Sequence, residues 1–260
     1  AHKPFRTQRR SYAALIGLIF ISRQENNGKM IKRINSCLHR DLIKAANQPG
    51  IFDPVSRASL YETMAFMLET GDHNENNLKA SLSYWEKSIK LTRSPWAMEH
   101  AGSICLELGE MTGNEFFFRK ALRFFMEIHD PLDEKSDLAA ALGDVFYHLG
   151  RYEDAVRQYS SYFEPGDVDP EMQPIFLRYL DALEKINSPI TDITDIAEQK
   201  LYALGADHAF DSYRGAIQER IFHSYFKARK HRSALRTAIN SRGLMKGLFR
   251  YVKRMFHPHK

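Results

Sequence analysis

Residues 136–169 read SDLAAALGDVFYHLGRYEDAVRQYSSYFEPGDVD, and their pattern sets the expectation for the rest of the chain. Apolar residues recur there every three or four positions, which indicates two amphipathic helices separated by a turn at Gly150. Small residues at Gly143 and Ala155 allow the two helices to approach closely, while larger side chains fill the space beside them. We therefore expect an antiparallel helix hairpin in this segment.

The positions that define this hairpin are Leu142, Gly143, Phe146, Gly150, Tyr152, Ala155 and Tyr159. In this combination the segment resembles a tetratricopeptide repeat, a helix pair of about 34 residues that stacks on its neighbours. Residues 95–127 and 56–91 are weaker copies, and residues 12–38 and 210–238 match in part. Gly102 and Gly143, matched between two copies, are further apart than the family period, so the repeats should be irregular.

The resemblance implies an all-α fold, namely a right-handed superhelical array of antiparallel helix hairpins (a TPR-like α-solenoid) with irregular repeats and a C-terminal capping helix. Three segments are expected. Residues 1–50 form a basic N-terminal hairpin, residues 51–169 the TPR-like repeats, and residues 170–260 further helical repeats that end in a basic amphipathic helix.

Apolar spacing and turn residues predict the individual helices. Gly28, Gly71, Gly109 and Gly150 are expected at turns, and the pairs Ser94-Pro95 and Asp169-Pro170 are expected at helix starts. The predicted helices span residues 11–24, 29–46, 56–70, 77–92, 95–110, 114–128, 133–148, 152–163, 170–186, 192–204, 207–228, 231–240 and 242–256.

Composition limits the class of protein. With 260 residues and 43% hydrophobic content, the chain can bury a sizeable core. Its two cysteines exclude a disulfide framework and a site of four thiolates. Charge is segregated: residues 1–50 carry 10 basic and 2 acidic side chains, residues 51–210 carry 14 and 28, and residues 211–260 carry 13 and 2. The two ends could therefore contact anionic partners that the middle would repel.

Catalytic motifs are not recognisable in the sequence. His39-Arg40-Asp41 matches part of a protein-kinase loop, but no glycine-rich loop precedes it and no Asp-Phe-Gly follows. The 11 histidines do not form HExxH or a zinc-finger spacing, and no GxGxxG, GxxxxGK[ST] or GxSxG string occurs. We expect no enzyme, cofactor, metal site or small-molecule substrate.

In the tetratricopeptide family, fixed positions of each first helix line the concave surface. Carried over to this chain, the resemblance implies a partner-binding groove of Tyr61, Glu69, Trp96, Glu99, Ser103, Glu107, Asp137, Asp144, Tyr147 and His148. Aromatic and acidic residues should prefer a basic or amphipathic helix or an extended peptide. Repeats that grip a chaperone's terminal carboxylate carry Lys, Arg and Asn at such positions, so that subclass is excluded.

Both ends of the chain allow two interpretations. Residues 243–257 place apolar side chains on one helical stripe and Lys246, Arg250, Lys253 and Arg254 opposite, which fits either a cap on the last hairpin or a helix lying on an anionic membrane. Arginines before the apolar residues 12–21 fit either a buried opening helix or a retained targeting segment or anchor. That apolar run is about half the length that spans a bilayer.

These observations favour a non-enzymatic protein-binding scaffold or adaptor in the cytoplasm, with a protein or peptide as its partner. The first alternative is a peripheral membrane or envelope-assembly factor that docks through its cationic termini. The second is nucleic-acid binding through the same basic ends. This class is disfavoured because the sequence lacks interleaved surface aromatics and a nucleic-acid motif.

Overall fold

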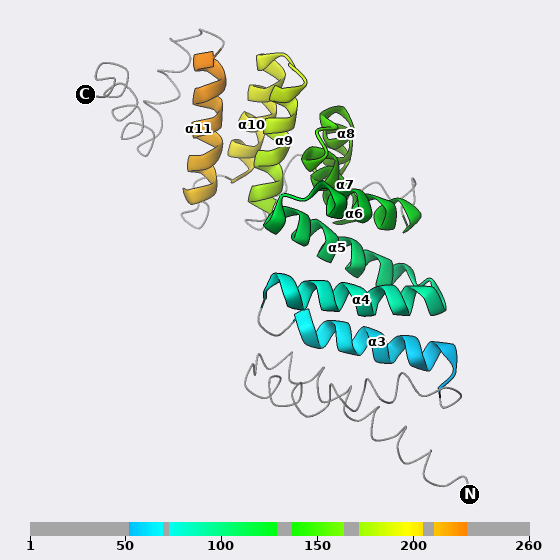
Figure 1. Cartoon of the computed structure of the whole chain (residues 1–260). Coiled ribbons are helices and arrows are strands. Elements are labelled where there is room, and N and C mark those ends of the chain that lie inside the picture. The colour runs from blue at the N-terminus through cyan, green and yellow to red at the C-terminus, as the bar shows by residue number, and fades with distance from the viewer. Residues whose placement is uncertain (1–51, 70–72, 129–136, 164–171, 205–210, 228–260) are drawn as a thin grey trace, which may run out of the picture. The chain divides into compact units, whose positions relative to one another are not determined.

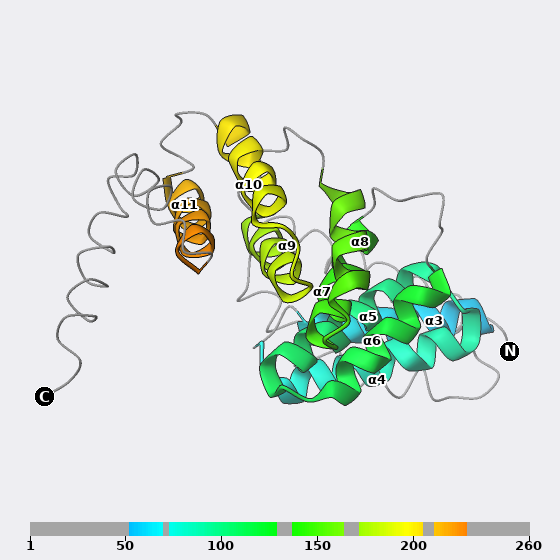
Figure 2. The ribbon, with the colours of Figure 1, turned by 90° about the horizontal axis from the view of Figure 1, so that it is seen from above.

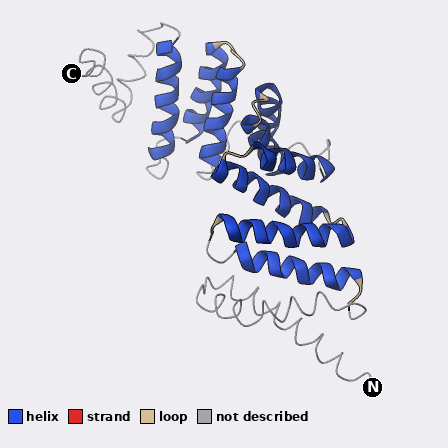
Figure 3. Ribbon diagram, in the orientation of Figure 1, coloured by secondary structure: helices blue, strands red, loops and turns tan. Residues whose placement is uncertain are grey.

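The computed structural model describes residues 52–69, 73–128, 137–163, 172–204 and 211–227, and within them every regular element is a helix (Figures 1 and 3). The expectation of an all-α fold is confirmed for this part of the chain. The chain divides into two compact units, residues 1–129 and residues 130–260. Helix labels are those of Figure 1.

The first unit contains α3 (Pro54–Glu69), α4 (Glu75–Thr92), α5 (Pro95–Thr112) and α6 (Glu115–Ile128). Each helix packs beside the next, as Figures 1 and 2 show. Helix α5 begins where the sequence predicts, because the Ser94 side chain accepts a hydrogen bond from the backbone N–H of Ala97 and Pro95 occupies the first turn.

Two glycines inside α5 bring it close to α6. A Cβ atom at Gly102 would lie 2.4 Å from the Phe125 ring, and one at Gly109 would lie 2.5 Å from the Phe118 ring. The prediction of a turn at Gly109 is therefore wrong. The chain reverses at Gly113, where a φ of 66° ends α5 in the left-handed conformation that glycine adopts readily.

The second unit contains α7 (Asp137–His148), α8 (Tyr152–Tyr162), α9 (Gln173–Lys185), α10 (Ile190–Leu204) and α11 (Asp211–Lys227). Helix α7 packs on α8, α8 on α9, and α10 mainly on α11. The predicted turn at Gly150 is confirmed by its φ of 72°. Helix α9 begins at Gln173, with Pro174 in its first turn.

Contacts between successive hairpins repeatedly join residues 34 positions apart. In the first unit, Arg93 pairs with Glu127, and Lys120 Nζ lies 2.8 Å from Glu86 Oε1. In the second unit, Tyr147 donates a hydrogen bond of 2.7 Å to Asp181. The spacing equals the usual period of about 34 residues in tetratricopeptide repeats, so neighbouring hairpins meet through positions one period apart.

Several predictions fall outside the described residues. They include the expected hairpin of residues 1–50, the turns at Gly28 and Gly71, the Asp169-Pro170 helix start and the helices expected after residue 230. Among the described helices, none is both long enough and apolar enough to cross a membrane.

Candidate functional site

One side of α5 carries partly or fully exposed residues at helical spacing. Trp96, Glu99, Ser103 and Glu107 recur on it every three or four positions, and Glu110 extends the same side. The other side is buried in the first unit through Ala97, Met98, Ala101, Ile104, Cys105 and Leu108. The structure thus brings four predicted groove residues together and adds Glu110. We call these five residues the α5 stripe.

Trp96 stands in a cluster of four rings from three helices, namely Phe66 of α3, Trp85 of α4, and Trp96 and His100 of α5. The Trp96 ring centroid lies 5.1 Å from those of Phe66 and Trp85 and 4.7 Å from that of His100. Trp85 is fully buried, whereas Trp96 keeps 44% of its surface exposed. This ring cluster therefore fixes the position of an aromatic side chain that still faces solvent.

The structure gives two predicted groove residues of α3 other roles. Glu69 accepts hydrogen bonds from Trp85 Nε1 at 2.5 Å and from Ser81 Oγ at 2.8 Å, so its carboxylate joins α3 to α4. Tyr61 is buried and stacks on Tyr84 of α4 at 6.2 Å between ring centroids. Neither side chain continues the α5 stripe, because both satisfy contacts between the first two helices.

The charge of the first unit is divided between its helices. Helix α5 contains three glutamates and no lysine or arginine. One of these glutamates, Glu107, pairs with His73, whose side chain is largely exposed. Among the described helices of this unit, the lysines and arginines lie mainly on α4 and α6, where several pair with carboxylates of the same two helices, such as Lys120 with Glu86. The side chains of α5 itself therefore sum to a negative charge.

In the second unit, the predicted groove residue Asp144 lies inside the protein. It is only 6% exposed, accepts a hydrogen bond of 2.5 Å from the Tyr159 hydroxyl, and pairs with Arg178 at 3.0 Å. The Tyr159 pKa is raised, first by burial and then by the Asp144 carboxylate. The prediction of an accessible groove carboxylate is therefore wrong at this position, since Asp144 joins α7 to α8 and α9.

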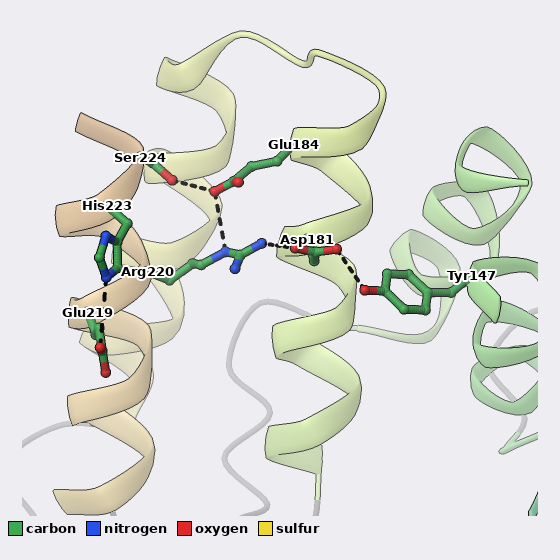
Figure 4. Close-up of polar contacts among 7 residues, drawn as sticks. All are labelled: Tyr147, Asp181, Glu184, Glu219, Arg220, His223 and Ser224. Carbon is green, nitrogen blue, oxygen red and sulfur yellow. Dashed lines mark hydrogen bonds and ion pairs between the residues drawn. The ribbon is translucent and has the colours of Figure 1, made fainter. Parts of the chain in front are cut away.

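Tyr147 belongs to a polar network that joins α7, α9 and α11 (Figure 4). Its hydroxyl donates to Asp181, which also pairs with Arg220, and Arg220 Nε lies 3.3 Å from Glu184. Ser224 Oγ donates to the same glutamate at 2.7 Å. The carboxylates of this network face arginine and hydroxyl groups of the protein itself, which satisfy their charge and hydrogen-bonding capacity.

Burial and the hydrogen bond to Asp181 raise the Tyr147 pKa to about 12. Burial alone would raise the Asp181 pKa, but the hydrogen bonds from Tyr147 and Arg220 and the arginine charge outweigh it, so the pKa lies below its ordinary value. His148 is half-buried with its ring against Tyr147 at 5.5 Å. Asp137 is the first residue of α7, and its side chain lies outside the description.

The candidate membrane or anion contacts, Lys246, Arg250, Lys253 and Arg254, also lie outside the described residues. Within the described part, no group of three His, Cys, Asp or Glu side chains is placed to hold a metal ion. Burial raises the pKa of Cys105 to about 12, so this thiol stays protonated near neutral pH.

Comparison with known proteins names no family for this chain. No protein-family model matches it, and a search of curated proteins finds no match. The resemblance to tetratricopeptide repeats therefore rests on the residues and contacts described above.

Proposed function

We propose that this chain is a non-enzymatic protein-binding adaptor whose partner docks on the α5 stripe and the ring cluster. The observation that carries the proposal is the environment of Trp96, which stays partly exposed while three rings hold it. Such a side chain offers a large contact area and loses little conformational freedom on binding, as the aromatic hot spots of protein interfaces do.

We further propose that the hairpins form a right-handed TPR-like superhelix closed by a C-terminal capping helix. Two observations support this arrangement. Contacts between hairpins join residues 34 positions apart in both units. Gly143 faces the Tyr159 ring, and the tetratricopeptide pattern that this hairpin resembles has a small and an aromatic residue at these two positions. Such an array presents its first helices on one surface and leaves them available to a protein or peptide.

The proposed partner is basic or amphipathic, because the α5 stripe carries three carboxylates and helix α5 contains no lysine or arginine. Affinity capture with the full chain, followed by mass spectrometry, would identify it. Trp96→Ala should lose the captured protein while retaining the wild-type melting temperature to within a few degrees. The matched control is Phe116→Ala on α6, because Phe116 is also an aromatic residue and is 60% exposed. Capture that survives Trp96→Ala and is lost with Phe116→Ala contradicts the proposed surface.

The charge distribution supports a second candidate function, docking on an anionic membrane surface. Residues 211–260 carry 13 basic and only 2 acidic side chains, including the four cations between residues 246 and 254. In this version the array would recruit a protein to the membrane, as expected of an envelope-assembly factor. Flotation of the full chain with anionic and with neutral vesicles distinguishes the two candidates, since only membrane docking predicts binding that depends on lipid charge.

A further inference from the structure

Three carboxylates of α5 lie along one side of the helix, where the side chains are partly or fully exposed. Glu99, Glu107 and Glu110 share this side with Ser103, and Trp96 stands at its start. With a rise of about 1.5 Å per residue, the line from Trp96 to Glu110 is roughly 21 Å long. This length corresponds to about four turns of a second helix laid against α5.

The backbone of α5 cannot pair with a partner's backbone. Its N–H and C=O groups hydrogen-bond within the helix, so an extended peptide on this stripe would find no ladder of donors and acceptors. A helical partner satisfies its own backbone and can present side chains every three or four residues. The stripe is therefore better matched to a helix than to a strand.

Resting on the proposed function, we propose that the α5 stripe binds an amphipathic helix whose lysines or arginines are spaced to meet Glu99, Glu107 and Glu110. An apolar residue of the same helix packs on Trp96, where the ring cluster leaves the indole partly exposed. The partner runs antiparallel to α5, since this orientation places opposite ends of the two helix dipoles together. His73, the described ion-pair partner of Glu107, is largely exposed and is displaced or remains at the edge of the contact.

The two tryptophans provide the readout for a direct test. Trp85 is fully buried and Trp96 is 44% exposed, so a change in fluorescence or in quenching by acrylamide on binding reports Trp96. The probe is a synthetic helix of about 18 residues, long enough to cover the stripe. Its three lysines have the same spacing along the peptide as Glu110, Glu107 and Glu99 have along α5, read in that order. A leucine follows the third lysine at the distance that separates Glu99 from Trp96. Its control peptide has the same composition with the lysines distributed around the helix.

The full chain at low salt should bind the matched peptide at least about tenfold more tightly than the control peptide. Glu99→Gln, Glu107→Gln and Glu110→Gln together should remove this preference. The matched control variant combines Asp192→Asn, Asp195→Asn and Glu198→Gln, which neutralises three exposed carboxylates of α10 and should leave binding unchanged. Circular dichroism should show that both triple variants remain helical.

Equal affinity for the two peptides, or no binding of either, overturns the proposed cationic helix. So does matched-peptide binding that survives neutralisation of the three α5 glutamates. These failures leave the proposed function standing if a captured protein still depends on Trp96. Loss of that dependence removes the proposed function as well.

Discussion

Gly143 of α7 faces the Tyr159 ring of α8 so closely that a Cβ atom at Gly143 would lie 2.5 Å from the ring carbon Cε1. Both residues are buried, and the Tyr159 hydroxyl is held by Asp144 on the same α7 helix. Helices α7 and α8 therefore approach closely at this point because Gly143 has no side chain and the Tyr159 ring occupies the space beside it.

Gly143→Ala should destabilise the protein by roughly 1–3 kcal/mol, because the ring cannot move away without losing its hydrogen bond. The control is Gly215→Ala in α11, where a Cβ atom would meet nothing within 4 Å. There alanine should stabilise the helix by up to about 1 kcal/mol. Denaturant unfolding of both variants measures the difference, and equal effects at the two glycines would refute the close approach.

Tyr159→Phe should cost about 1–3 kcal/mol of unfolding free energy, because it leaves one side of the buried Asp144 carboxylate without its hydroxyl donor. Tyr152→Phe is the control, since the Tyr152 ring packs on Tyr147 in the same unit. Its effect should stay within about 0.5 kcal/mol. Thermal unfolding that ranks the two variants in the opposite order would contradict the role given to Asp144.

The raised pKa of Tyr147 predicts a loss of stability in alkali. The folded protein holds this proton more tightly than the unfolded chain, so the stabilisation is complete below the ordinary tyrosine pKa of 10.0 and disappears as the pH rises towards about 12. Wild-type unfolding free energy should therefore fall more steeply between pH 10 and 12 than that of Tyr147→Phe. Parallel curves for the two proteins would show that Tyr147 does not contribute to this dependence.

Removal of residues 242–260 tests the two interpretations of the basic amphipathic segment. If it caps the last hairpin, the shortened protein should have a lower melting temperature and lower solubility, because apolar side chains become exposed. A shortened protein that melts like the full chain but no longer floats with anionic vesicles would instead favour the membrane interpretation.

Much of the helical pattern was predictable because apolar periodicity depends on neighbours along the chain. The expected helix 77–92 corresponds to α4 (Glu75–Thr92), and the expected helix 152–163 to α8 (Tyr152–Tyr162). Gly109 was misread because a glycine serves both chain reversal and close helix packing. Only the position of the Phe118 ring on the next helix distinguishes the two roles.

The sequence predicted exposed residues of the candidate site correctly only where their spacing along one helix places them on the same side. Trp96, Glu99, Ser103 and Glu107 share one side of α5 through their spacing alone. Asp144 was placed wrongly because its partner Arg178 comes from another hairpin. The apolar spacing within one hairpin does not reveal a partner in the next hairpin. Asp144 and Arg178 are separated by one repeat period, however, and a search at that separation could have found the pair.

His100 and Phe66, which hold Trp96, were missed for the same reason. They lie 34 positions apart, and their ring centroids are 4.8 Å apart. A search for aromatic pairs at this separation would have found them. The ring cluster thus depends on the repeat register, whereas the exposed carboxylates of α5 depend only on the helix.

The most direct test of the account is the dissociation constant of a captured partner for the wild-type chain, Trp96→Ala and Phe116→Ala. If Trp96 is the anchor, its truncation should weaken binding by about 2 kcal/mol, or roughly thirtyfold. Phe116→Ala should leave the constant within about twofold of the wild-type value. An unchanged constant for Trp96→Ala, in a protein that melts normally, would contradict the assignment of the α5 stripe and ring cluster as the binding surface.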